Sequence, residues 1–149
     1  MGRRADISSM EKLRQLIYVS SAVRLLREPE LLEILEVARA NNSQLDVTGM
    51  LLYAGGSFIQ VLEGDAQMVE RVVRKIKRDA RHRGFLTLLD RVLEERDFEG
   101  WNMGFHRVSE QELDQIAGFH DWSAEMPTRR KTAAGVRLIE SFRHTAMRR

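Results

Sequence analysis

Two extended apolar runs joined by a pair of glycines constrain the fold of this chain more than any other feature. Residues 47–54 and 57–63 are rich in the aliphatic and aromatic side chains that favour strands. Gly55 and Gly56 lie between the two runs and can take the positive φ angles that a tight hairpin turn needs. The pattern therefore predicts a β-hairpin in the middle of the chain.

A strand and a helix are predicted before the hairpin. Residues 13–20 form a short apolar run with alternating side chains, which is typical of a strand. Pro29 lies where a helix can begin, because the first helical position needs no N–H donor. Apolar residues then recur at the spacing of one helix face, namely Leu31, Ile34, Leu35 and Ala38. We expect this helix to end at Asn41 and Asn42.

Further helices and strands are predicted after the hairpin. Gly64 and Asp65 stop the preceding strand and cap a second helix, whose apolar face consists of Val69, Val72, Val73 and Ile76. Residues 85–93 and 101–106 alternate as strands do. Ser109 and Glu112 then have the spacing of a capping box, which indicates a short third helix.

The order strand, helix, strand, strand, helix, strand, strand predicts an α+β fold of the ferredoxin-like sandwich type. Its mixed five-stranded sheet would carry two helices on one face, with the first and third strands as central neighbours. We expect one domain over residues 13–108. An N-terminal extension over residues 1–12 would precede it, and a C-terminal helical extension with a basic tail over residues 109–149 would follow it.

Composition limits the class of protein. The 149 residues are 43% hydrophobic and 31% charged, the proportions of a globular protein with one core. There are no cysteines, which excludes disulfides, thiol nucleophiles and zinc thiolate sites. No apolar run is long enough to span a membrane and no signal peptide is evident, so we expect a cytoplasmic protein. Residues 128–149 hold seven basic side chains and one acidic one.

Two polar residues interrupt the predicted core. Gln60 shares a strand face with Phe58 and Leu62, which is costly unless its amide is hydrogen-bonded. Tyr18 faces the same way on the neighbouring central strand, so its hydroxyl can meet that amide under the helices. The two residues form either a buried structural pair or part of a ligand site. Asn42 adds a third polar group near the same space, or serves only as a helix cap.

Several motifs in the same order resemble the BLUF domains, which sense blue light using flavin. They are YVSS at 18–21, NNSQLDVTGMLLY at 41–53, FIQVLEG at 58–64, IKRDARH at 76–82 and RDFEGWNMG at 96–104. The resemblance covers residues 13–108. It implies a flavin bound without a covalent bond between the two helices, FAD as in most of the family, with FMN or riboflavin as alternatives.

The resemblance also implies roles for individual residues. Tyr18 would donate an electron and a proton, Gln60 would switch its hydrogen bonds, and Asn42 would hold a flavin carbonyl. Trp101 and Met103 would relay the switch outward, although the pattern alone makes them core residues. The remaining flavin contacts would be Ile34, Asn41, Lys75, Ile76, Asp79, Arg81 and His82, where Asn41 replaces a histidine of some relatives and Lys75 also fits a solvated helix end.

The predicted function is a blue-light photoreceptor that signals by protein–protein interaction. We expect a homo-oligomer and a downstream protein partner, with the C-terminal segment on the open sheet face or on a second subunit. The four histidines are scattered, and the HExxH, GxSxG and P-loop motifs are missing, so we expect neither an enzyme nor a metal site. An RNA-binding module of the same fold is the alternative, but its aromatic stacking signature is missing.

Overall fold

A computed structural model of the chain describes residues 12–54, 56–100 and 103–108. Its elements in chain order are β1 (Leu13–Ala22), α2 (Glu28–Leu45), β2 (Thr48–Ala54), β3 (Ser57–Asp65), α3 (Ala66–Arg78), β4 (His82–Leu93) and β5 (Gly104–Val108). This order confirms the predicted ferredoxin-like sandwich. The predicted N-terminal extension, apart from residue 12, and the predicted C-terminal helices lie outside the described residues.

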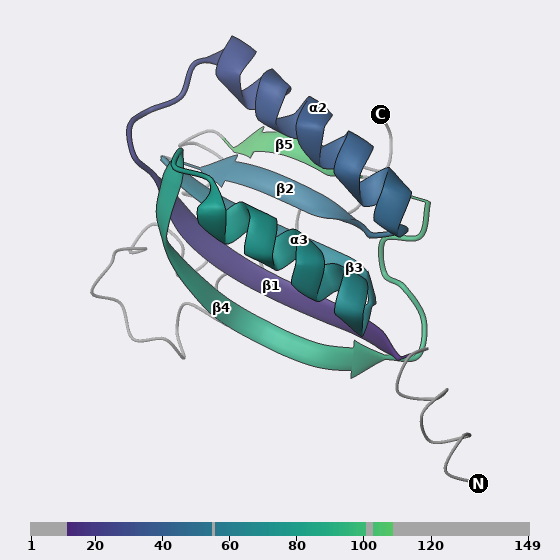
Figure 1. Ribbon diagram of the computed structural model, residues 1–149. Coiled ribbons are helices and arrows are strands. Elements are labelled where there is room, and N and C mark those ends of the chain that lie inside the picture. Colours follow the sequence, from purple (N-terminus) through teal and green to yellow (C-terminus); the bar gives the residue numbers. More distant parts are fainter. Residues whose placement is uncertain (1–11, 55, 101–102, 109–149) are drawn as a thin grey trace, which may run out of the picture.

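The five strands form one mixed sheet in the order β4-β1-β3-β2-β5. Strand β1 pairs antiparallel with β3 and with β4, and β2 pairs antiparallel with β3. Strand β5 joins the edge of the sheet by parallel pairing with β2. Strands β1 and β3 are therefore neighbours inside the sheet, as the sequence pattern predicts (Figure 1).

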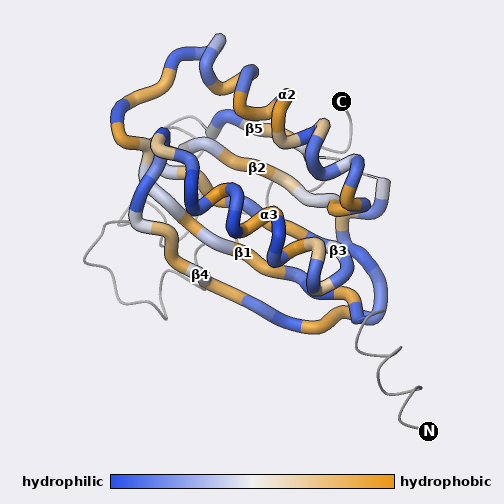
Figure 2. The backbone as a smooth tube through the Cα atoms, viewed as in Figure 1, coloured by the Kyte–Doolittle hydropathy of each residue, from blue (hydrophilic) through white to orange (hydrophobic). Residues whose placement is uncertain are grey.

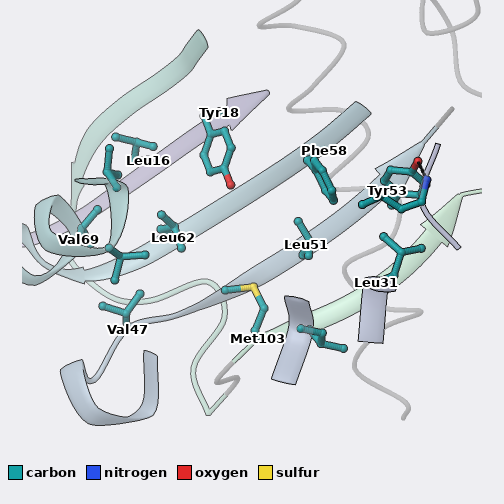
Figure 3. Close-up of a cluster of buried hydrophobic side chains, with 14 residues drawn as sticks. Leu16, Tyr18, Leu31, Val47, Leu51, Tyr53, Phe58, Leu62, Val69 and Met103 are labelled. Carbon is teal, nitrogen blue, oxygen red and sulfur yellow. Dashed lines mark hydrogen bonds between the residues drawn. The ribbon is translucent and has the colours of Figure 1, made fainter. Parts of the chain in front are cut away.

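Both helices lie on the same face of the sheet (Figure 1). Helix α3 is strongly amphipathic, with Val69, Val72 and Val73 buried and basic side chains outward, and Figure 2 shows this alternation along its tube. Asp65 caps its first turn by accepting the Gln67 N–H at 2.9 Å. Side chains from α2, α3 and the covered sheet face form one buried cluster (Figure 3).

The opposite face of the central strands is also buried, although no described helix covers it. Alternation along the strands places a second set of side chains there, each at most 2% exposed: Ile17, Met50, Leu52, Ile59 and Val61. The two faces together explain why these strands read as nearly continuous apolar runs.

Helix α2 extends beyond its predicted end. It continues past Asn41 and Asn42 to Leu45 and stops at Asp46, which takes a left-handed conformation with φ 54°. Leu45 follows Ala38 by seven residues and packs against the buried cluster, so the apolar face continues for one more turn. Asn42 is therefore a buried residue of the last turn, where its backbone carbonyl accepts the Val47 N–H at 2.9 Å.

The last two strands also differ from their predicted bounds. Strand β4 begins at His82, three residues before the predicted start, because its pairing with β1 extends to Ala22 opposite His82. Strand β5 begins at Gly104, opposite Met50, and not at residue 101. The Met103 carbonyl accepts a hydrogen bond from Arg39 Nε at 2.9 Å, so a helix side chain takes a group that a strand would use for pairing.

Within the described residues, no helix has both the length and the apolar character needed to cross a membrane.

Candidate functional site

Tyr18 and Gln60 meet at the centre of the sheet. The register between β1 and β3 places the two residues directly opposite each other, on the face that the helices cover. The Tyr18 hydroxyl donates a hydrogen bond to Gln60 Oε1. The side chains are 3% and 4% exposed, so water cannot replace either partner. The contact predicted from strand alternation is therefore present.

The other half of the Gln60 amide has a different partner. Gln60 Nε2 donates to the Met103 sulfur at 3.4 Å, and Met103 is only 1% exposed. A thioether is a weak acceptor and has no proton to donate. Figure 3 shows the Met103 thioether and the Tyr18 hydroxyl in the same buried cluster. The result is a polar chain that runs from Tyr18 through Gln60 to Met103.

The surroundings of Tyr18 keep its phenol neutral. Burial raises the pKa of Tyr18 above its ordinary range, and the negative charge of Asp79 raises it further. The Tyr18 ring stacks on the Phe85 ring of β4, with ring centroids 4.3 Å apart. Tyr18 is thus held in one orientation with its proton in place.

A pocket opens between the two helices and the sheet beside this pair. All ten residues predicted to bind the cofactor line it, namely Tyr18, Ile34, Asn41, Asn42, Gln60, Lys75, Ile76, Asp79, Arg81 and His82. The structure thus brings the predicted set together around one space, and the binding role of each residue stays a prediction. Trp101 lies outside the described residues, and Met103 contacts Gln60 without lining the pocket.

Six further lining residues were missed by sequence reasoning, namely Ser20, Val37, Ala38, Leu51, Phe58 and Val72. Most of them follow the pattern of ordinary core residues, and Val37 is half exposed on α2. Ser20 was detectable in principle, because it follows Tyr18 by two residues and therefore shares its strand face.

Two buried polar atoms at the pocket have no hydrogen-bond partner among the described residues. They are Ser20 Oγ and His82 Nδ1. Buried polar atoms are rarely left unpaired, since each costs about 1–3 kcal/mol. The lining therefore fits a ligand that carries polar groups as well as an apolar body.

A charged group borders the pocket where α3 ends. The Arg81 guanidinium donates to Asp79 at 2.6 Å and lies 3.9 Å from Glu33 of α2. The hydrogen bond from Arg81 lowers the pKa of the Asp79 carboxyl. Lys75 is exposed on the last turn of α3 and also lines the pocket. This border can present cationic groups to an anionic part of a ligand.

No cluster of His, Cys, Asp or Glu that could hold a metal ion occurs in the part of the chain that the structure describes.

The raised pKa of Tyr18 predicts how the protein behaves in alkali. In the Tyr53→Phe variant, Tyr18 is the single remaining tyrosine. Its phenol should stay protonated as the pH passes about 10, and only the unfolded chain should release the proton. Stability should then fall by about 1.4 kcal/mol per pH unit above that point. An absorbance titration of tyrosinate, followed together with circular dichroism, should show ionisation only as the protein unfolds. Ionisation near pH 10 in folded protein would contradict the buried site.

Comparison with known proteins identifies the family. The model of the family described as sensors of blue-light using FAD, BLUF, matches residues 13–104. Photoactivated adenylate cyclase subunit beta of Euglena longa is 36% identical over 86 residues, which are 58% of this chain and 10% of that protein. The blue light- and temperature-regulated antirepressor BluF of Escherichia coli strain K12 is 34% identical over 84 residues, 56% of this chain and 21% of that protein.

A solved structure of a BLUF protein is also similar to this chain. BlrB, a BLUF protein in its dark state, matches with a TM-score of 0.64 and 30% sequence identity, over 85% of this chain and 98% of that one. The chain spans only a small part of the curated relatives, but nearly the whole of BlrB. With this fold and the Tyr18–Gln60 pair, the match places the chain in the BLUF family of flavin-based blue-light sensors.

Proposed function

We propose that this chain senses blue light with a flavin held in the pocket between α2, α3 and the sheet. One observation carries the proposal: the hydrogen-bonded pair of Tyr18 and Gln60 lines a pocket, and two other lining residues, Ser20 and His82, carry buried polar atoms with no hydrogen-bond partner among the described residues. A purely structural Tyr–Gln pair needs no such space beside it. In this arrangement, the hydrogen bonds of the Gln60 amide can respond to a change in a ligand bound in the pocket.

Apolar lining residues would contact the ring of the cofactor, and polar lining residues would contact its polar edges. Ile34 and Ile76 reach the pocket from opposite helices and would flank a planar ring. Asn41 and Asn42 would offer amide groups to its carbonyl edge, and the buried Ser20 hydroxyl is a further donor. All of these contacts are non-covalent.

The charged border of the pocket would meet the polar tail of the cofactor. Lys75, Arg81 and His82 can bind phosphate or ribose groups, and Asp79 holds Arg81 in place. The family description favours FAD as the bound flavin. FMN or riboflavin would use the same ring contacts with fewer contacts at this border.

Tyr18 and Gln60 have the chemistry that a light-driven switch requires. A bound flavin supplies the absorption of blue light and an acceptor for one electron. Tyr18 would supply an electron to that acceptor and pass its proton toward Gln60 Oε1, the atom that its hydroxyl already bonds. Gln60 can rotate its amide, which exchanges the acceptor oxygen and the donor NH₂. After rotation the NH₂ group faces Tyr18, and the oxygen faces a Met103 sulfur that has no proton to give.

This exchange changes the environment of β5. Met103 directly precedes that strand and would lose its hydrogen bond from Gln60. Strand β5 lies at the sheet edge, where its single neighbour among the described strands is β2. Small shifts of an edge strand cost less than shifts of a central one. We therefore assign Met103 and β5 to the output path, with Trp101 as a second relay residue.

The output is proposed to be a change in interaction with a protein partner. The family is a sensor family, and we propose that residues 13–108 carry no turnover chemistry of their own. The match to BLUF proteins leaves the RNA-binding alternative without support. We also propose that residues 109–149 cover the second sheet face or contact a second copy in a cytoplasmic homo-oligomer. The buried side chains of that face, such as Met50 and Val61, support this placement.

Removing the reactive groups should abolish the photoreaction. The protein loaded with FAD should show a flavin absorption spectrum that shifts reversibly to the red under blue light. Tyr18→Phe lacks the phenol proton and Gln60→Leu lacks the amide, so neither variant should show the shift. Tyr53→Phe is the matched control, because Tyr53 is equally buried but pairs with the Leu26 N–H. Persistence of the shift in either reactive variant, or a protein that takes up no flavin, would contradict the proposal.

Deleting the basic tail should separate sensing from output. A chain without residues 128–149 keeps every described pocket residue, so it should bind flavin and show the full red shift. Its oligomer mass in light scattering, or its rate of dark recovery, should change at least a few-fold if the tail contributes to assembly. Identical mass and recovery in the two chains would show that the tail has no such role.

A further inference from the structure

Glu63 is a buried acid that the pocket does not use. It lies on β3, three residues after Gln60, and alternation points it to the opposite face of the sheet. It is 0% exposed and is absent from the pocket lining. A fully buried carboxylate is costly unless hydrogen bonds replace its water. Its partners therefore indicate what the residue does.

The Glu63 carboxylate holds the connection between β4 and β5. Oε1 accepts the backbone N–H of Phe98 at 2.9 Å, and Oε2 accepts that of Asp97 at 3.1 Å. Oε2 also accepts from Gln15 Nε2 at 2.7 Å, and Gln15 is 2% exposed. Three donors thus converge on one carboxylate. Two of them belong to consecutive backbone amides, so Glu63 fixes the course of the chain itself.

The same connection has a second anchor at its other end. Arg39 Nε on α2 donates to the Met103 carbonyl at 2.9 Å. Phe98 is 2% exposed, so its side chain also anchors the first end. Five residue steps separate Phe98 from Met103, a span of at most about 18 Å. The described residues on either side of this stretch are thus both held by hydrogen bonds from other elements, Phe98 by Glu63 and Met103 by Arg39.

We propose that Glu63 and Arg39 are positioning residues that hold Met103 against the Gln60 amide. The proposal rests on the proposed function, because it concerns the relay from Gln60 to β5. Glu63 would act on Met103 indirectly, by fixing the backbone at Asp97 and Phe98. Arg39 acts directly, through its hydrogen bond to the Met103 carbonyl. The Gln60 hydrogen bond to a weak sulfur acceptor at 3.4 Å depends on this external support. Because Met103 is held against the Gln60 amide, a rotation of that amide would change the position of Met103 and of β5, which follows it.

Glu63→Gln tests the first anchor with little change in volume. The substitution turns one acceptor oxygen into an NH₂ group that faces donors, so at least one of the three hydrogen bonds is lost. Asp97→Asn is the matched control, because it also removes one carboxylate from this network. The Asp97 side chain accepts from Gln15 at 3.0 Å, whereas the tether uses only its backbone N–H. Arg39→Gln tests the second anchor at a part-buried site that folding tolerates better.

The first measurement needs no light. Methyl NMR of methionine-labelled protein reports the Met103 environment, and Met103→Leu assigns its signal. Glu63→Gln and Arg39→Gln should each shift or broaden the Met103 signal, and Asp97→Asn should leave it in place. An unmoved Met103 signal in folded Glu63→Gln and Arg39→Gln protein would overturn the proposal, whether or not flavin binds.

The second measurement is a double-mutant cycle on dark recovery in the flavin-loaded protein. Glu63→Gln should keep the red shift and change the recovery rate by about tenfold, and Met103→Ala should do the same. The double variant should match Met103→Ala alone, since Glu63 acts through Met103. Multiplied effects would mean that Glu63 has a separate structural role and would overturn the relay. A wild-type chain without a red shift would instead overturn the proposed function, and the relay with it.

Discussion

The register between β1 and β3 is the constraint on which the site depends. It places Tyr18 opposite Gln60 and sets Leu16 opposite Leu62 on the same face. A slip of one residue would turn every side chain of one strand to the other face and separate the reactive pair. Burial on both faces opposes such a slip, because a packed side chain of the slipping strand, such as Val61, would have to move into the site that its chain neighbour now fills. The apolar core thus sets the position of a polar pair to within a hydrogen-bond length.

The polar chain inside this core has one strong contact and one weak one. Tyr18 donates to an amide oxygen, which is a good acceptor, whereas the Gln60 NH₂ has a thioether as its partner. An amide held firmly on both sides would have one orientation only. A weak partner on one side lowers the free-energy difference between the two orientations, and a state change in the pocket can then select between them. The Glu63 and Arg39 anchors matter for the same reason, because a weak contact needs its partner held in place.

Local alternation and turn signals predicted the order of helices and strands, and the fold type that this order indicates predicted the β1–β3 pairing and with it the Tyr18–Gln60 contact. They failed where distant residues decide the outcome. The end of α2 depends on Leu45 packing against the cluster, and the start of β5 on a hydrogen bond from Arg39, 64 residues before Met103. The sequence pattern placed Glu63 only at the end of a predicted strand. Its role in binding the backbone N–H groups of Asp97 and Phe98 was not predictable, because these lie 34 and 35 residues away. Tyr18, Gln60 and Asn42 were singled out by the residue pattern and the other seven predicted pocket residues by the family resemblance, whereas Ser20 was missed because one hydroxyl in a strand carries little signal.

A light-minus-dark infrared spectrum of flavin-loaded protein with isotope-labelled tyrosine tests most directly whether the Tyr18–Gln60 hydrogen bond changes in the light. The chain has two tyrosines, and the Tyr53→Phe variant leaves Tyr18 as the only labelled one. We expect a label-sensitive phenol band that shifts between dark and light, because the partner of the Tyr18 hydroxyl changes from the oxygen to the nitrogen of Gln60. A difference spectrum with flavin bands but no tyrosine band would contradict this expectation, since the hydrogen bond at the centre of the sheet would then take no part in sensing.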